Sequence, residues 1–342
     1  MSSPLISVDK LRVTYGKSLT AVADVDLSIL EGETLGLVGE SGCGKSTLGR
    51  ALLRLEPITS GEVRIGDKAL SKMRGAELRK TRADLQMIFQ DPLGSLNPHR
   101  SVRDIVADPL RHLRKRTKKE ALAEASELLD RVGLSGLGDR RPHEFSGGQR
   151  QRIGIARAIA PNPRFIVADE PVSALDVSVQ AQVINLLVQL KREQQLTVLF
   201  ISHDLGVVRH VADRIAVMYL GTIVEIADRD AFFAGPLHPY SEALLSAVPE
   251  LGAPGEEKRE RIVLRGELPN PGNPPPGCRF SSRCMYAQER CVTETPELRM
   301  TANGRQVSCH FPLQIQTAAA RQADGEQADA WKTKRYKEDV IR

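Results

Sequence analysis

The sequence lacks any stretch close to the ~20 consecutive apolar residues that a membrane-spanning helix needs. Residues 1–10 also lack the basic start and the apolar run of a secretory signal. We therefore expect the chain to stay in the cytoplasm unless a membrane partner holds it. A strong charge imbalance is missing too, because 48 basic and 43 acidic residues leave a net charge of +5. An excess this small does not by itself call for a nucleic-acid partner.

The 342 residues, 41% of them hydrophobic, are enough for about two domains with a packed core. Apolar and polar residues alternate over residues 5–15 and 21–30, which predicts an antiparallel pair of strands. Shorter apolar runs predict strands at residues 34–38, 61–65, 85–89, 165–168 and 197–201, and a hairpin at 214–220 and 223–227. Between them, helical spacing predicts a mostly helical insert with helices at residues 101–113, 118–132 and 150–160.

A glycine-rich loop follows the apolar run at residues 34–38, and it fits the pattern Gly, four residues, Gly-Lys-Ser/Thr. Its residues are Gly39, Glu40, Ser41, Gly42, Cys43, Gly44, Lys45, Ser46 and Thr47. Glycines let backbone amides approach the phosphates of a nucleotide, and the helix that begins near Lys45 favours negative charge. We predict that Lys45 reaches the β- and γ-phosphates and that Ser46 ligates Mg²⁺. A glycine-rich turn that matches by chance is the alternative.

A second glycine-rich segment begins a predicted helix and comprises Ser146, Gly147, Gly148 and Gln149. Serine is a good N-cap, and glycines at a helix start offer bare amides to a phosphate. One nucleotide rarely needs two such sites on the same chain. The second segment is therefore predicted to serve a nucleotide held elsewhere, for example by another copy.

Polar residues follow two of the predicted buried strands. Asp169 and Glu170 come after residues 165–168, and His203 comes after residues 197–201. The carboxyl ends of parallel strands form the ligand-binding edge of an α/β sheet. Asp169 is predicted to hold Mg²⁺ with Ser46, Glu170 to polarise a water, and His203 to contact the γ-phosphate. The alternatives are that the two acids are ordinary surface residues and that the histidine has a structural role. The functional interpretation depends on the buried strands that precede these residues.

The order of these motifs resembles that of the nucleotide-binding subunits of ATP-binding cassette transporters over residues 5–230. The resemblance assigns Tyr15 to adenine stacking, residues 39–47 to Walker A, Gln90 to the Q-loop, residues 146–149 to the signature, Asp169 to Walker B, Glu170 to the catalytic glutamate, Asp176 to the D-loop and His203 to the switch histidine. It implies a competent ATPase with catalytic roles for Glu170, His203, Gln90 and Lys45. It also implies that ATP contacts Tyr15, the phosphate loop, the signature and Asp176, and that Mg²⁺ is held by Ser46, Gln90 and Asp169.

The resemblance also implies the fold, an α/β P-loop NTPase (RecA-like) core with an antiparallel β subdomain and a helical insert, followed by a small irregular region that contains cysteines. The implied domains are the core at residues 1–92 and 161–235, the helical subdomain with the signature at 93–160, the C-terminal peptide-importer-type region at 236–315 and a polar tail at 316–342.

Residues 90–98, 171–182 and 238–240, with Leu244 and Leu245, resemble the oligopeptide and dipeptide importer branch. The residues after the Q-loop resemble in particular its second ATPase subunit. The resemblance implies import of peptides, with nickel or another small solute as the alternative. The implied partners are a sister ATPase or a second copy of the chain, two membrane permease subunits at the cytoplasmic face of the membrane and, indirectly, an extracytoplasmic solute-binding protein. Nucleic acid is not an expected partner. A cassette protein acting on DNA or ribosomes needs a long coiled coil or a second cassette, and neither is present; a metal or redox sensor is a third candidate.

Four of the five cysteines, Cys278, Cys284, Cys291 and Cys309, lie close together in the sequence, with five, six and seventeen residues between them. A cytoplasmic location disfavours disulfides. The gaps exceed those of zinc-knuckle pairs and match neither common ferredoxin spacing. Similar tails in the peptide-importer branch are associated with a [4Fe-4S] cluster, and four thiolates can hold one. We therefore expect a cluster that staples the tail, with zinc or four free thiols as alternatives.

Overall fold

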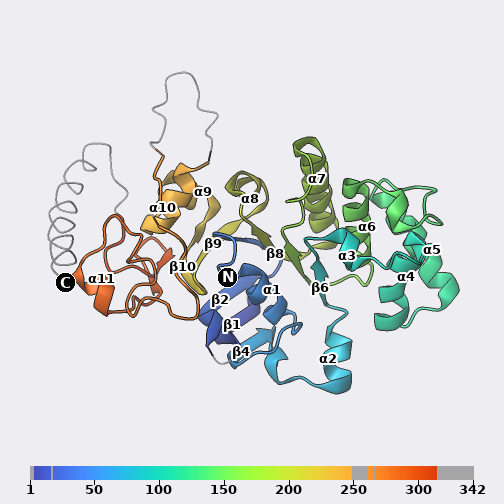
Figure 1. Cartoon of the computed structure of the whole chain (residues 1–342). Coiled ribbons are helices and arrows are strands. Elements are labelled where there is room, and N and C mark those ends of the chain that lie inside the picture. The colour runs from blue at the N-terminus through green and yellow to red at the C-terminus, as the bar shows by residue number, and fades with distance from the viewer. Residues whose placement is uncertain (1–3, 17, 249–260, 265, 314–342) are drawn as a thin grey trace. The chain divides into compact units, whose positions relative to one another are not determined.

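The computed structural model describes residues 4–16, 18–248, 261–264 and 266–313, and Figure 1 labels many of its helices and strands. The predicted polar tail at residues 316–342 lies outside these ranges. The chain divides into two compact units, of which the first comprises Met1–Val13, Val22–Val38 and Lys45–Asp213. The second comprises Thr14–Ala21, Gly39–Gly44 and Arg214–Arg342. No helix in the described ranges is long and apolar enough to cross a bilayer.

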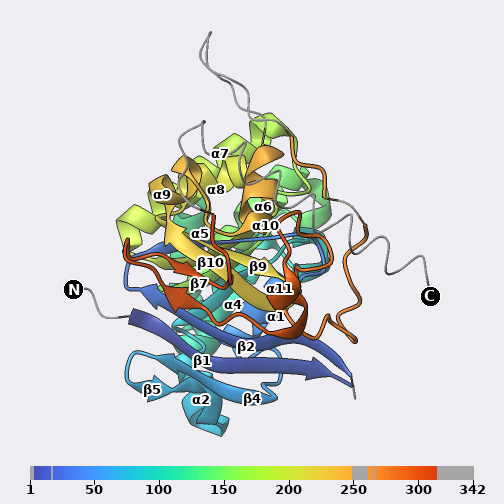
Figure 2. The ribbon, with the colours of Figure 1, turned by 90° about the vertical axis from the view of Figure 1, so that its left-hand side faces the viewer.

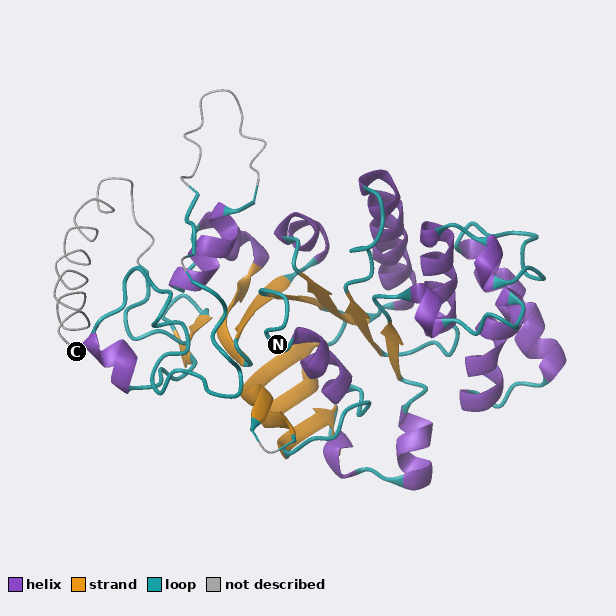
Figure 3. Ribbon diagram, in the orientation of Figure 1, coloured by secondary structure: helices purple, strands orange, loops and turns teal. Residues whose placement is uncertain are grey.

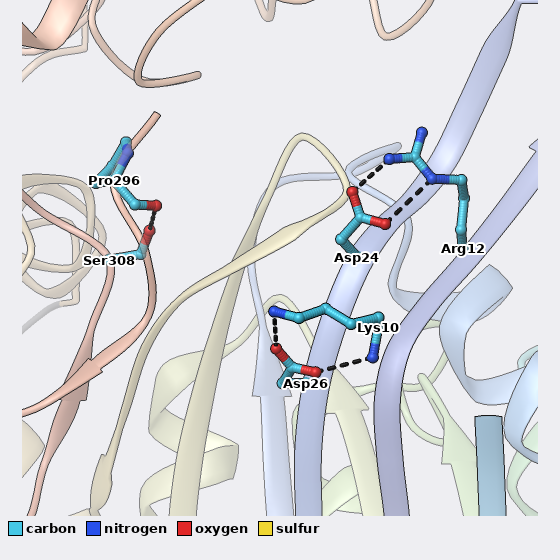
Figure 4. Close-up of polar contacts among 6 residues, drawn as sticks. All are labelled: Lys10, Arg12, Asp24, Asp26, Pro296 and Ser308. Carbon is cyan, nitrogen blue, oxygen red and sulfur yellow. Dashed lines mark hydrogen bonds and ion pairs between the residues drawn. The ribbon is translucent and has the colours of Figure 1, made fainter. Parts of the chain in front are cut away.

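The first unit contains most of an antiparallel sheet with the strand order β2-β1-β4-β5 (Figure 2). The strands are β1 (Pro4–Tyr15), β2 (Leu19–Leu30), β4 (Ser60–Ile65) and β5 (Lys68–Ala69). Ile6 lies opposite Ile65 in the register of β1 and β4, and both side chains are buried. On the exposed side, Lys10 pairs with Asp26 at 2.6 Å and Arg12 pairs with Asp24 (Figure 4). The predicted strand pair is therefore confirmed.

The first unit also contains four parallel strands in the order β3-β8-β7-β6. Their bounds are β3 (Thr34–Val38), β6 (Leu85–Ile88), β7 (Phe165–Asp169) and β8 (Thr197–Ser202). Every residue of β3 and β7 is buried, as expected for a parallel sheet covered by helices. Helix α1 (Lys45–Leu52) packs on β7 and β8, and a Cβ at Gly49 would lie 2.8 Å from Val167. The four strands run in the same direction, so their carboxyl ends meet at one edge.

The helical insert follows β6 and includes α3 (Pro92–Ser95), α4 (Val102–Leu113), α5 (Lys118–Arg131), η2 (Pro142–Glu144) and α6 (Gly147–Ile159). The N-cap Ser101 accepts the Asp104 amide, and Thr117 forms a capping box with Glu120. These helices agree with the three predicted ones to within a few residues. The first unit is completed by η1 (Leu70–Lys72), α2 (Gly75–Thr81), α7 (Val177–Gln194) and α8 (Leu205–Val211).

The second unit contains the predicted hairpin, β9 (Arg214–Tyr219) and β10 (Thr222–Asp228), extended by β12 (Gln306–Val307) and β11 (Arg299–Met300). Its helices are α9 (Arg229–Ala234), α10 (Pro239–Ser246) and α11 (Glu289–Thr293). Figure 3 shows that the described part of residues 261–313 is mostly loop, which confirms the predicted irregular C-terminal region. Side chains tie these loops together; for example, Ser308 Oγ donates to the Pro296 carbonyl at 2.8 Å (Figure 4).

Candidate functional site

Two predicted metal ligands meet at the edge of the parallel sheet in the first unit. Asp169 ends β7 and is 1% exposed, and Ser46, in the first turn of α1, donates its hydroxyl to Asp169 Oδ1 at 2.7 Å. Burial raises the pKa of Asp169, although the bond from Ser46 and the charge of Arg50 oppose that rise. Mg²⁺ is usually bound through one or two carboxylates together with substrate phosphates, so this pair of oxygens suits it. Arg50, which none of the sequence motifs indicated, lies with its Nη2 3.9 Å from Asp169 Oδ2.

Glu170 lies just beyond β7 and adopts a left-handed backbone conformation, with φ of 43°. This conformation is uncommon for residues other than glycine and is often found at functional sites. Its backbone N–H donates to the Ile201 carbonyl of β8 at 3.0 Å, which holds the turn in place. The carboxylate accepts the Gln90 amide N–H at 3.0 Å, and His203 Nδ1 lies 3.3 Å from Glu170 Oε1. Three predicted catalytic residues, each following a different strand, therefore converge.

The signature segment forms the start of α6. Ser146 Oγ accepts the Gln149 N–H at 3.3 Å, and Gln149 Oε1 accepts the Ser146 N–H at 3.0 Å, which completes a capping box. A Cβ at Gly148 would lie 2.3 Å from Val179 Cγ1, so only glycine allows this approach to α7. Asp176 is exposed and occupies the N-cap position of α7 without a side-chain capping bond. A Cβ at Gly147 would lie 3.4 Å from Leu175, so both glycines of the signature face the region around the start of α7.

The phosphate loop begins in the second unit, which contains residues 39–44. A Cβ at Gly39 would lie 2.2 Å from the Met218 carbonyl, and one at Gly44 would lie 2.2 Å from the Ala21 carbonyl. Nothing lies within 4 Å of a Cβ at Gly42, but its φ of 78° favours glycine. Gly39 and Gly44 therefore also serve close packing, a reason that the motif pattern did not give. The chain continues from Gly44 into Lys45, which is 5% exposed in the first unit.

Two residues of the second unit that sequence analysis did not assign to the site hold Glu40 of this loop. Arg283 donates to both Glu40 carboxylate oxygens at 2.7 and 3.0 Å, and Tyr240 Oη accepts the Glu40 backbone N–H at 2.8 Å. Arg283 is 243 positions away from Glu40, and no local pattern could have indicated the pairing. Tyr15, the predicted adenine-stacking residue, ends β1 with 37% of its surface exposed.

The four C-terminal cysteines line a single small cavity in the second unit, together with His238, Phe280 and His310 among others. All four are free thiols. Gly277 allows the chain to approach α11 closely, and the Cys278 N–H donates to the Cys291 carbonyl at 2.8 Å. Burial raises the pKa of Cys284 and of Cys309 to about 12, so both are protonated at neutral pH unless a cation displaces the proton.

The predicted iron-sulfur centre is not confirmed. Within the described residues, no group of three or more His, Cys, Asp or Glu side chains has an arrangement that holds a metal ion. The structure brings the four thiols to one cavity, yet it does not give them a coordination geometry. This result does not bear on the predicted Mg²⁺ site. Ser46 and Asp169 contribute only one carboxylate, so they could not form a group of three or more such side chains.

Comparison with known proteins gives two family matches. Residues 22–173 match the ABC transporter family, and residues 224–291 match the family described as the oligopeptide/dipeptide transporter, C-terminal region. The oligopeptide transport ATP-binding protein AppF of Bacillus subtilis is 53% identical over 293 residues, covering 85% of this chain and 89% of the relative. The oligopeptide transport ATP-binding protein OppF of Escherichia coli is 53% identical over 285 residues, covering 82% and 85%.

Among solved structures, the dimeric post-hydrolysis state of the ATP-binding cassette MJ0796 with ADP and Pi matches with a TM-score of 0.60 and 32% identity. The match covers 66% of this chain and 98% of that one. A second structure, cbiO1 of Clostridium perfringens, matches with a TM-score of 0.62 and 27% identity over 68% of this chain and 91% of that one. These likenesses confirm the predicted P-loop NTPase fold.

Proposed function

The chain belongs to the ABC transporter ATP-binding proteins of the oligopeptide/dipeptide branch, and on that premise we propose that it hydrolyses ATP to power the import of peptides. The observation that carries the catalytic part is the convergence of Gln90 and His203 on the Glu170 carboxylate, at 3.0 and 3.3 Å. The C-terminal family match and the names of the relatives favour peptides over nickel as the solute.

We assign the hydrolytic roles as follows. Glu170 accepts the proton of the attacking water, and the Gln90 amide and the His203 ring hold its carboxylate in place. Lys45 and the amides of residues 39–47 bind the phosphates. Ser46 and Asp169 would hold Mg²⁺, with Gln90 as a further ligand. Bound Mg²⁺ supplies positive charge that offsets the charge developing on the phosphoryl oxygens.

We further propose that two such subunits enclose two ATP molecules head to tail, as a pair of identical copies or with a sister ATPase. The signature residues 146–149 then complete the site of the partner, and Asp176 lies at the same interface. Two observations support this arrangement: Asp176 is exposed, and the next residue, Val177, has 82% of its surface exposed although it is apolar. Both side chains are therefore accessible to a partner subunit. Tyr15 is assigned to the adenine ring of ATP.

A groove of about 800 Å³ in the first unit offers a docking site for a membrane permease subunit. It runs beside Gln90 and is lined by apolar side chains, including Leu55, Met87 and Phe89, with Arg82 and Arg157 among its charged residues. Leu55 is 49% exposed. We propose that a cytoplasmic segment of a permease subunit fills this groove, which would hold the chain at the cytoplasmic face of the membrane and link closure of the ATPase pair to transport.

For the cysteine cavity we propose a [4Fe-4S] cluster with a stapling role. The support is that four thiols line one cavity within a loop-rich segment, which has little regular structure of its own to hold it. Iron and acid-labile sulfide in anaerobically purified protein are the expected result. Stoichiometric zinc without sulfide, or protein free of both, would contradict it.

The transport proposal is tested on the assembled transporter. The tagged chain should co-purify with membrane permease subunits, and in lipid vesicles with the solute-binding protein its ATP hydrolysis should rise when peptides are added. Nickel is the matched control and should give no stimulation. Stimulation by nickel alone, or co-purification with ribosomes or DNA in place of permeases, would contradict the proposal.

A further inference from the structure

Glu40 is the one acidic residue in the phosphate loop, residues 39–47. A carboxylate in an anion-binding loop opposes the binding of a triphosphate, because like charges repel. The Glu40 side chain is only 27% exposed, so water screens its charge incompletely. A positive group that offsets the charge of Glu40 would therefore favour binding of the triphosphate.

The structure provides a guanidinium partner. Arg283 Nη1 lies 2.7 Å from Glu40 Oε2, and Arg283 Nη2 lies 3.0 Å from Oε1, so both carboxylate oxygens are bonded by one planar group. Two parallel bonds of this kind orient the carboxylate as well as offsetting its charge. The Arg283 side chain is 8% exposed, which distinguishes it from the exposed surface ion pairs of this chain. Such partly buried pairs are screened much less by salt.

A second bond holds the backbone of the same residue. Tyr240 is fully buried, and its hydroxyl accepts the Glu40 N–H at 2.8 Å. The Tyr240 ring packs edge-on against Tyr219, with centroids 4.7 Å apart, and lies tilted against Phe280, with centroids 5.4 Å apart. Phe280 lies three positions before Arg283, so one aromatic cluster orders both of the groups that hold Glu40.

We propose that Arg283 and Tyr240 are positioning residues for the phosphate loop. Tyr240 holds the loop backbone at Glu40, Arg283 offsets the Glu40 charge, and the C-terminal segment thereby raises the affinity of the loop for a nucleoside triphosphate. The inference rests on the proposed ATP site. Arg283 directly precedes Cys284, which lines the cysteine cavity. The residue that offsets the Glu40 charge and a residue of the cysteine cavity are therefore neighbours in the chain.

The test uses the full-length chain, with the dissociation constant of a fluorescent ATP analogue measured in Mg²⁺ and the kcat and KM of hydrolysis measured in parallel. Arg283→Gln should weaken binding about tenfold and raise KM similarly, while kcat stays within about twofold, because the unpaired Glu40 charge acts on binding. Arg283→Lys keeps the charge without the fork and should lose only about threefold. The double variant Glu40→Gln/Arg283→Gln should return to within about twofold of the parent chain, since both charges are gone.

Tyr240→Phe removes only the hydroxyl and should weaken binding about threefold. Arg299→Gln, which removes an exposed arginine of the same region, is the control and should leave affinity and melting temperature unchanged. Unchanged affinity in Arg283→Gln, or a double variant as weak as the single one, would overturn the proposal. If Arg283→Gln does not fold, the Lys variant and the double variant decide in the same way. A parent chain that binds no ATP would instead contradict the proposed function.

Discussion

The edge of the parallel sheet that carries Asp169, Glu170 and His203 and the loop-rich segment at residues 266–313 are held together by different forces. At the sheet edge, backbone hydrogen bonds between buried strands place Asp169, Glu170 and His203 at neighbouring positions. In the C-terminal segment, much of the order comes from side chains, such as Arg305 on Glu225 and Arg283 on Glu40. The comparison teaches that a substitution at the sheet edge should remove activity and spare the fold, whereas one in the C-terminal segment should cost stability.

The largest expected effect tests the sheet edge. Glu170→Gln should reduce steady ATP hydrolysis by about 10²- to 10⁴-fold, the usual contribution of a general base. ATP binding should persist, because the amide oxygen can still accept the Gln90 N–H, the amide NH2 can face the His203 ring, and the change removes a negative charge beside the phosphates. Phosphate release and analogue binding measure the two properties, and Glu77→Gln, at an exposed position on α2, is the control. A normal rate of hydrolysis, or a large loss of stability, would contradict the view that substitutions at the sheet edge remove activity and spare the fold.

The next effect tests the C-terminal segment. Glu225 is fully buried and accepts the Leu237 and His238 amides, both at 2.9 Å, and Arg305 at 3.0 Å. Arg305→Met should lower the free energy of unfolding by ~3–5 kcal/mol, because a buried charge loses its partner. Arg299→Met breaks the exposed pair with Glu297 and should cost less than about 1 kcal/mol. Chemical denaturation measures both, and equal effects would mean that burial does not decide the outcome.

A third prediction concerns acid. Burial lowers the pKa of His238 to about 3, below its usual value near 6.5, and His238 Nδ1 accepts the Tyr240 N–H at 3.0 Å. A depressed histidine pKa means that the unfolded chain binds the proton more readily, so stability is complete above pH 6.5 and declines towards pH 3. The expected loss at pH 5 is about 2 kcal/mol.

The matched variant for this prediction is His238→Asn. Asparagine can still accept the Tyr240 N–H at the N-cap, but it does not titrate, so the share of the acid loss that His238 causes should disappear. His210→Asn makes the same substitution at an exposed histidine and controls for the change of side chain itself. The free energy of unfolding measured between pH 8 and pH 5 distinguishes the three chains. An unaltered profile for His238→Asn would show that another group is responsible.

The smallest effect concerns the exposed ion pairs of β1 and β2. Lys10→Met should change the free energy of unfolding by less than about 1 kcal/mol, and high salt should reduce the difference further. The hydrogen bond and charge of Asp26 raise the pKa of Lys10, so whatever this pair contributes is present below pH 10.5 and lost above it. Denaturation at low and high salt measures the change. A loss as large as that of Arg305→Met would contradict the view that burial separates the two kinds of pair.

Sequence reasoning went furthest where the determinants are local. The phosphate loop, the signature N-cap and the acids that follow β7 are short patterns whose structural meaning depends on a few neighbouring residues and on the period of the adjacent strand or helix. For that reason the helices, the strands and the pairing of Ser46 with Asp169 could be predicted. The left-handed backbone of Glu170 could not, because it depends on the Ile201 carbonyl of another strand.

By itself the sequence determined the fold class of the chain and which side chains gather at the edge of the parallel sheet. The reason is that the carboxyl ends of buried parallel strands all lie at the same edge of a sheet. The sequence also suggested that the four C-terminal cysteines gather, but only the tertiary structure decided that they line a cavity with His238 and His310 and that Arg283 holds Glu40 across 243 positions. Such contacts depend on how loops pack against one another. Loops have no periodic sequence pattern, so these contacts could not be predicted from the sequence.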